Sequence, residues 1–160
     1  MKLFTIGHSN RETENFIELL KVNHIKLVLD VRRYPRSPKF PQYDGRNLQE
    51  ALKEAEIIYQ WMGDSLGGFR VEGYENYMKS ELYKSGIEQL EEMGRKLNTA
   101  IMCAEKHVTR CHRLHISNSL SELGWSVVHI IDKHTRFDHD TLLQSLRDYR
   151  TDASQMQLPF

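Results

Sequence analysis

Stretches typical of strands and helices alternate along almost the whole chain. Apolar or β-branched runs occur near residues 3–6, 26–31, 57–61, 99–103 and 126–131. Stretches that favour helices occur at 13–20, 46–55, 74–79, 87–97, 110–123 and 140–149. Because parallel neighbours need long crossover connections, this alternation predicts a mostly parallel sheet with helices on both faces. We therefore expect an α/β protein, a Rossmann-like three-layer sandwich built on a five-stranded sheet.

The run from Lys26 to Val31 illustrates the pattern best. It is nearly continuously apolar, which is typical of a strand buried on both faces of a parallel sheet. At 160 residues the chain has the size of one domain. We expect residues 1–150 to form a single α/β domain and residues 151–160 to be a frayed tail. Strand order and oligomeric state do not follow from the pattern.

The composition excludes several classes of partner. Lys plus Arg and Asp plus Glu are both 22, so the net charge does not support nucleic acid as a partner, although a local basic patch would still bind it. No run approaches the ~18 apolar residues of a membrane span. The first residues, Met1 to Phe4, enter a predicted strand rather than a signal peptide. We therefore expect no membrane association, a cytoplasmic location and reduced cysteines.

Polar or glycine-containing loops follow the first four predicted strands. They hold His8 and Ser9, residues 30–36, the glycine-rich loop 63–68, and residues 103–113. The last of these contains both cysteines of the chain. Ligands of open α/β sheets bind outside the carboxyl ends of the strands, where such loops meet. The sequence therefore predicts a polar pocket at this edge of the sheet.

Several short motifs, taken in order, resemble a known family. They are Thr5-Ile-Gly-His-Ser9, Asp30-Val-Arg32, Leu66-Gly-Gly68, Tyr74 with Tyr77-Met78, Met102-Cys-Ala-Glu105, Cys111-His-Arg113 and Val128-His-Ile130. Together they span about residues 3 to 131 and are similar to the motifs of the domain-of-unknown-function family 488. The resemblance implies a compact α/β domain and leaves the activity open.

The loop from Cys103 to Arg113 has three possible interpretations. Cys103 closes a strand before a helix, which is the position of the nucleophile in cysteine phosphatases and rhodanese-type sulfurtransferases. However, six residues separate Cys103 from Arg110 where the phosphatase motif has five, and Glu105 would face the dianion. A metal site built from Cys103, Glu105, Cys111 and His112 with His8 or His129 is a second possibility, but the spacing is not diagnostic. The third is that both cysteines only pack in the core. We expect no metal and no cofactor.

Arginines near the predicted pocket indicate an anionic ligand. Guanidinium groups bind phosphate or carboxylate through paired hydrogen bonds, so Arg32, Arg36 and Arg113 are candidates to hold the anion. The other candidates for substrate binding are Ser9, Asp30, Tyr77, Cys111 and His112. Asp30 also suits a purely structural ion pair, because a carboxylate that ends an apolar strand is costly unless it is paired.

The leading hypothesis is a small enzyme, a hydrolase or group transferase, for an anionic phosphate-bearing or nucleotide-like substrate. His8 and Glu105 are the candidate acid and base, and Cys103 is a third candidate catalytic residue that lines the pocket. One alternative is a non-catalytic module that binds a nucleotide or a nucleic-acid end. A further alternative is a metal-dependent or thiol-redox protein.

Overall fold

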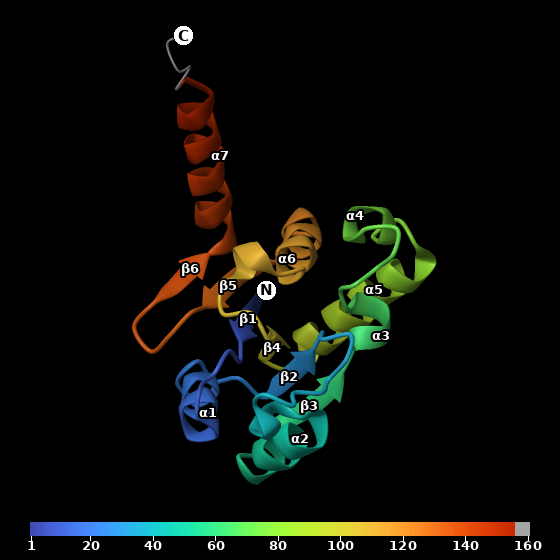
Figure 1. Cartoon of the computed structure of the whole chain (residues 1–160), viewed down its shortest axis with the longest axis vertical. Coiled ribbons are helices and arrows are strands. Elements are labelled where there is room, and N and C mark those ends of the chain that lie inside the picture. Colours follow the sequence, from blue (N-terminus) through green and yellow to red (C-terminus); the bar gives the residue numbers. More distant parts are fainter. Residues whose placement is uncertain (156–160) are drawn as a thin grey trace.

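A computed structural model describes residues 1–155 and shows one six-stranded sheet (Figure 1). Its strands are β1 (Lys2–Gly7), β2 (Leu27–Asp30), β3 (Ile58–Trp61), β4 (Thr99–Cys103), β5 (Ser126–Ile130) and β6 (Arg136–Asp138). They lie in the order β3-β2-β4-β1-β5-β6, and the pairs among the first five strands are all parallel. The predicted α/β fold is confirmed, with one strand more than expected. The added strand, β6, pairs antiparallel with β5 at the edge.

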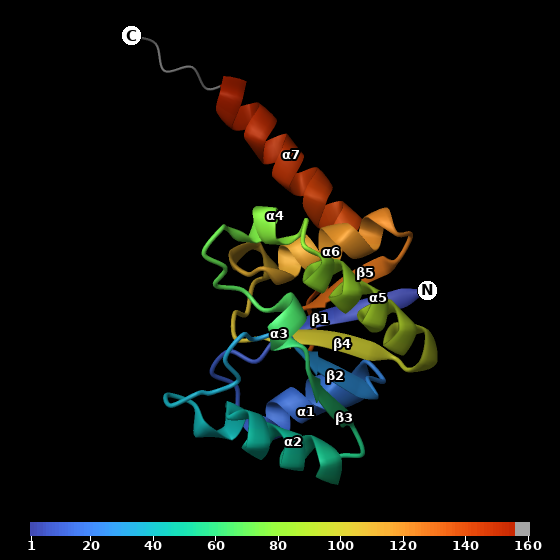
Figure 2. The same cartoon turned by 90° about the vertical axis from the view of Figure 1, so that its right-hand side faces the viewer.

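Helices cover both faces of the sheet (Figures 1 and 2). On one face lie α1 (Thr13–Val22), η1 (Pro41–Tyr43) and α2 (Gly45–Glu54), and on the other lie α3 (Gly63–Leu66), α4 (Tyr74–Tyr77), α5 (Glu81–Lys96) and α6 (Arg113–Glu122). Each face has its own hydrophobic core. The last helix, α7 (His139–Gln155), projects from the body beyond β5 and β6.

Strand β4 lies between β2 and β1 in the middle of the sheet, and its burial on both faces explains why its sequence is almost continuously apolar. All five of its residues are buried. Because side chains alternate along a strand, Ala100 and Met102 pack on the α1 and α2 face, whereas Ile101 and Cys103 pack on the face of α5 and α6. The same alternation that buries the strand therefore directs the Cys103 thiol towards α6.

Some predicted boundaries need correction. The glycine-rich loop at 63–68 begins with the short helix α3. Helix α5 starts at Glu81 rather than near 87, because the Ser80 side chain accepts a hydrogen bond from the Tyr83 amide and caps it. Helix α6 starts at Arg113 rather than 110, after the short helix η2 (Val108–Arg110). Of the predicted tail, 151–155 belong to α7 and 156–160 lie outside the described residues.

The topology leaves a crevice at the carboxyl ends of β1 and β4. These strands are neighbours, yet β1 leads to α1 on one face and β4 leads to α6 on the other. Loops that part in this way mark the usual ligand site of an open α/β sheet. Gly7 is required here, since any Cβ at this position would overlap the carbonyl oxygen of Glu105 in the loop that crosses the end of β1.

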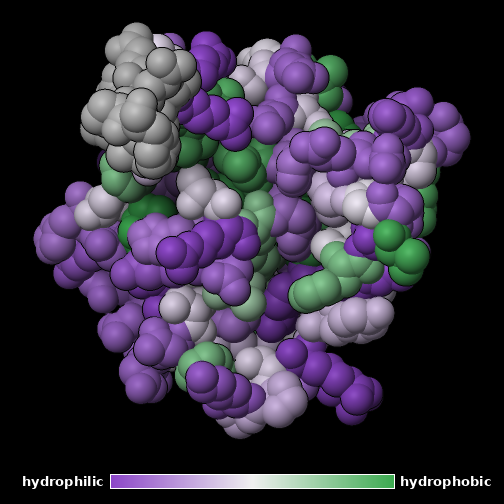
Figure 3. Space-filling model, turned by 45° about the horizontal axis from the view of Figure 1, so that its top comes forward, coloured by the Kyte–Doolittle hydropathy of each residue, from purple (hydrophilic) through white to green (hydrophobic). Residues whose placement is uncertain are grey.

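The face shown in Figure 3 is mostly hydrophilic, with hydrophobic side chains in small groups. Among the described residues, no helix is both long enough and apolar enough to cross a membrane.

Candidate active site

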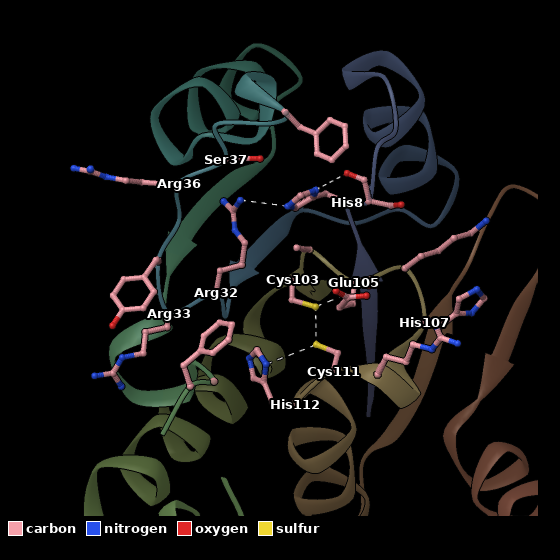
Figure 4. Close-up of a pocket in the computed structure, with 18 of the residues that line it drawn as sticks. His8, Arg32, Arg33, Arg36, Ser37, Cys103, Glu105, His107, Cys111 and His112 are labelled. Atoms are coloured by element: carbon pink, nitrogen blue, oxygen red, sulfur yellow. Dashed lines mark hydrogen bonds between the residues drawn. The ribbon is translucent and has the colours of Figure 1, made fainter. Parts of the chain in front are cut away.

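A cavity of about 900 Å³ opens at the carboxyl ends of β1, β2 and β4 (Figure 4). The loops after the first four strands all contribute to it, as the sequence predicts. Of the candidate residues, its lining includes His8, Ser9, Arg32, Arg36, Cys103, Glu105, Cys111 and His112. Three candidates lie outside the lining, namely Asp30, Tyr77 and Arg113.

The charges that line the cavity are strongly unbalanced. Five arginines and one lysine face a single carboxylate, that of Glu105. With respect to the carboxylates of residues 1–151, only Arg32 among these cations has one within ion-pair distance. The Nη1 atom of Arg33 is buried and has no hydrogen-bond partner. A cavity with this excess of positive charge favours anionic ligands.

The arginine that follows β2, Arg32, forms hydrogen bonds with other groups of the protein. Arg32 donates to both carboxylate oxygens of Asp30, at 2.9 Å from Nε and 2.6 Å from Nη2, and to the carbonyl oxygen of Tyr43 at 2.7 Å. The Tyr59 hydroxyl donates to the same carboxylate at 2.6 Å. Asp30 is fully buried and Arg32 is 7% exposed. The structural ion pair is therefore the interpretation of Asp30 that the geometry favours.

His8 supports this ion pair. Its Nδ1 donates to the Ser9 carbonyl oxygen at 2.8 Å, so Nε2 is the unprotonated nitrogen that faces Arg32 Nη1 at 3.3 Å. The ring stacks on Tyr43 with 4.2 Å between centroids. Burial, together with the charge of Arg32, lowers the pKa of His8 to about 4. Both ring nitrogens are engaged, so the expected acid-base couple with Glu105 is not formed.

The two cysteines meet in the wall of the cavity (Figure 4), with their Sγ atoms 2.6 Å apart. Arg113 lies beside both, with its Nε 3.0 Å from Cys103 Sγ and 3.4 Å from Cys111 Sγ. The guanidinium also donates to Thr5 Oγ1 and to the carbonyl oxygen of Glu105. At 1% exposure, Arg113 contacts the thiols from beneath and does not reach the cavity. The structure thus places it away from the anion that we expected it to hold.

Cys111 is the thiol that faces the ligand space. It is half-buried, whereas Cys103 is 3% exposed. His112 donates from Nε2 to the Val31 carbonyl oxygen at 2.8 Å, which leaves Nδ1 as an acceptor 3.7 Å from Cys111 Sγ. The hydrogen bonds that Cys111 makes with Cys103 and His112, together with the charge of Arg113, lower the pKa of Cys111, while burial raises that of Cys103. Of the two thiols, Cys111 is therefore the more exposed and the one with the lowered pKa.

Two aromatic residues outside the list of candidates, Tyr74 and Phe69, also line the cavity. Tyr74 lines the cavity in place of Tyr77, whose hydroxyl donates to the Ser65 carbonyl oxygen at 2.6 Å and whose ring lies 3.8 Å from the Arg70 guanidinium. Phe69 lines it as well, although it is 87% exposed, and its φ of 57° is unusual for a bulky residue.

Among the residues whose side chains the structure describes, 1–151, no group of three or more His, Cys, Asp or Glu is arranged to hold a metal ion. Cys103 and Cys111 face each other and Arg113 rather than a shared vacant centre.

A family model described as "Domain of unknown function DUF488" matches residues 12–120, which is more than half of the chain. The chain belongs to the DUF488 family. The matched region contains Asp30, Arg32, both cysteines and His112, and it begins after His8 and Ser9. No curated protein and no solved structure matches the chain. The family's description leaves the reaction open, so the function must be argued from the cavity itself.

Proposed function

We propose that this DUF488 protein is a small cysteine-dependent enzyme, a hydrolase or group transferase, for an anionic phosphate-bearing or nucleotide-like substrate. The observation that carries the proposal is the Cys111–His112 pair, which opens into a cavity with six cationic side chains.

Cys111 has the surroundings of an activated nucleophile. A thiolate attacks far more readily than a thiol, and an adjacent base that a third group orients is the usual means of producing it. Here His112 Nδ1 is the base and the Val31 carbonyl oxygen orients its ring. Arg113 stabilises the resulting negative charge from the buried side. In the proposed reaction, the Cys111 sulfur bonds to the electrophilic atom of the substrate, the bond to the leaving group breaks, and the leaving group takes up a proton. Water or an acceptor then displaces the Cys111 thiolate, which completes the hydrolysis or transfer.

The rest of the cavity supplies the substrate's binding groups. Arg33 and Arg110 have no carboxylate partner within the described chain and suit a phosphate oxygen. Tyr34, 66% exposed, and Phe69 present aromatic rings at the cavity, which suits stacking on a nucleotide base. Glu105, the single carboxylate, takes the role of acid for the leaving group.

A cytoplasmic location forms part of this proposal. The nucleophile works only as a free thiolate, and cytosolic thiols are kept reduced. Both cysteines are free in the structure.

The test begins with thermal-shift screening of phosphates, nucleotides and short oligonucleotides against the full chain. Any ligand found is then followed for binding and for product. Cys111→Ser is expected to bind the ligand and form no product, because the hydroxyl is a far weaker nucleophile than the thiolate. Arg33→Met is expected to weaken binding by about 1.5 to 3 kcal/mol through the loss of a charge-assisted hydrogen bond.

Glu105→Gln tests the acid separately, since the amide keeps the shape but cannot give a proton, and we expect binding without turnover. Normal turnover by Cys111→Ser would refute the thiol mechanism. Tight binding by the wild-type chain with no product from any ligand would instead favour the non-catalytic binding module.

A further inference from the structure

The two thiols form an asymmetric pair that the proposed reaction does not fully use. Only Cys111 is needed as the nucleophile, yet Cys103 Sγ lies 2.6 Å from Cys111 Sγ. These are the only cysteines in the chain, and seven residues separate them. The loop between them, which includes η2, already brings the sulfurs into contact, so a bond between them requires no unfolding of the sheet.

The surroundings give the two sulfurs different roles. Cys111 lines the cavity and is half-buried, so a small solute reaches it. Cys103 is held against the end of β4, and its Sγ lies 3.9 Å from the Glu105 carbonyl oxygen. Arg113 Nε contacts both sulfurs and therefore stabilises negative charge on either one. One accessible thiolate beside one buried thiol is the arrangement of an attacking and a resolving cysteine.

We propose that Cys111 and Cys103 form a peroxide-reactive dithiol, in which Cys111 reduces a hydroperoxide and Cys103 resolves the product as an intramolecular disulfide. This reaction differs from the substrate chemistry proposed above in its oxidant and in its use of Cys103. Cys111 is the nucleophile in both reactions.

The chemistry balances with a hydroperoxide as the only oxidant. The Cys111 thiolate attacks the outer peroxide oxygen, an S–O bond forms, the O–O bond breaks, and the departing alkoxide or hydroxide takes a proton from water. This gives a sulfenic acid on Cys111. The Cys103 sulfur then attacks the Cys111 sulfur, the S–S bond forms, and hydroxide leaves as water with the Cys103 proton. The two thiols lose two electrons in total, and the peroxide gains them.

The cavity suits the first step. A peroxide needs room beside the sulfur and a cation near the oxygen that takes up negative charge. The cavity at Cys111 is open, and Arg110 and Lys106 are among its lining residues. Cys103 has no comparable approach because it is 3% exposed. Oxidation is therefore expected to begin at Cys111 and to end at the disulfide.

The experiment uses the full chain, reduced and freed of reductant, treated with one equivalent of hydrogen peroxide and then with a maleimide. The wild type is expected to become a monomeric disulfide, with both thiols lost together and both restored by dithiothreitol. In Cys103→Ser, dimedone should trap a sulfenic acid on Cys111. In Cys111→Ser, Cys103 should react more than about tenfold more slowly than Cys111 does in the wild type.

Cys103→Ala serves as a second variant if the serine destabilises the core, and circular dichroism checks the fold of each variant. Three results with the wild-type protein would overturn the proposal. Both thiols could stay free, disulfide-linked dimers could form, or Cys111 could be oxidised to sulfinic acid while Cys103 stays reduced. The readout is the oxidation state of sulfur and needs no substrate. Failure of the dithiol would therefore leave the proposed enzyme standing, and absence of turnover would leave the dithiol standing.

Discussion

Two buried arginines lie close to the same cavity, Arg32 in its lining and Arg113 behind the two cysteines, and their partners differ. Arg32, after β2, is held by the Asp30 carboxylate, with 2.6 Å between Arg32 Nη2 and Asp30 Oδ2. Arg113, at the start of α6, contacts two sulfurs, a hydroxyl and a carbonyl oxygen. Among the side chains of residues 1–151, no carboxylate lies within ion-pair distance of it.

This difference separates a structural arginine, Arg32, from an arginine that lies beside the two thiols, Arg113. A buried cation needs negative charge nearby, and Arg32 has it from the Asp30 carboxylate. Arg113 receives it only when a neighbouring thiol gives up its proton. The fold therefore stabilises a thiolate through the buried charge of Arg113, whereas the same charge on Arg32 contributes to the shape of the β2 loop.

The strongest test of the comparison is Asp30→Asn. Removal of one partner from a buried pair leaves an uncompensated charge, which costs about 3 to 5 kcal/mol. We expect the free energy of unfolding, measured by urea denaturation, to fall by that amount. Tyr59→Phe is the matched control, because it removes a neutral donor to the same carboxylate and should cost about 1 kcal/mol. Equal losses in the two variants would show that the charge of Arg32 is not what Asp30 compensates.

Arg113→Met tests the other half. Loss of the cation should raise the pKa of Cys111 and move the pH profile of its alkylation rate by iodoacetamide to higher pH. Arg113→Lys keeps the charge without the planar guanidinium and should lie between the two. The rate is measured by mass spectrometry in Cys103→Ser, so that only Cys111 reacts. An unchanged rate in Arg113→Met would assign the thiolate to His112 alone.

Much of the fold could be predicted because burial dictates the pattern. Strands such as Leu27–Asp30 are buried on both faces and are therefore continuously apolar. Strand β6 was missed for the opposite reason. All three of its residues are exposed, so the backbone pairing with β5 leaves no apolar signal. Similarly, the start of α5 depends on one serine cap and not on a hydrophobic stripe.

The position of the cavity could be predicted from the sequence, but the contacts that its residues make could not. Loops after parallel strands must meet at one edge, which located the cavity. Whether an arginine faces ligand or core depends on where its helix sits, and Arg113 turns inward because α6 packs over β4 and Thr5 lies within reach. The contact between Cys103 and Cys111 likewise depends on the path of the loop, for which residue spacing has no rule.

A smaller effect is expected from the buried histidines on the Arg113 side. Thr5 Oγ1 links Arg113 to His129, and His129 lies 2.9 Å from His139. Burial, with the charges of His139 and Arg113, lowers the pKa of His129 to about 3. Between pH about 6.5 and about 3, His129 is therefore protonated in the unfolded chain and neutral in the folded chain. Stability falls with falling pH by at most ~1.4 kcal/mol per pH unit for this group.

His129→Gln should flatten that slope in urea denaturation measured as a function of pH, whatever it does to stability at pH 7. His134→Gln, at an exposed position, is the control and should leave the slope unchanged. An identical slope in wild type and His129→Gln would mean that the acid sensitivity arises elsewhere, with His8 the next candidate because burial also lowers its pKa.

The smallest effect should come from an ion pair on the surface. Lys133 Nζ lies 3.1 Å from Glu18 Oε1, a separation similar to that of the Arg32–Asp30 pair, but the two side chains are 59% and 53% exposed. Water already solvates both charges and screens their attraction, so Lys133→Ala should change the free energy of unfolding by less than about 0.5 kcal/mol. The measurement is the same urea denaturation as for Asp30→Asn. A loss at Lys133 as large as the loss at Asp30 would mean that ion-pair formation, and not burial, determines the cost, and the contrast between Arg32 and Arg113 would then lose its physical basis.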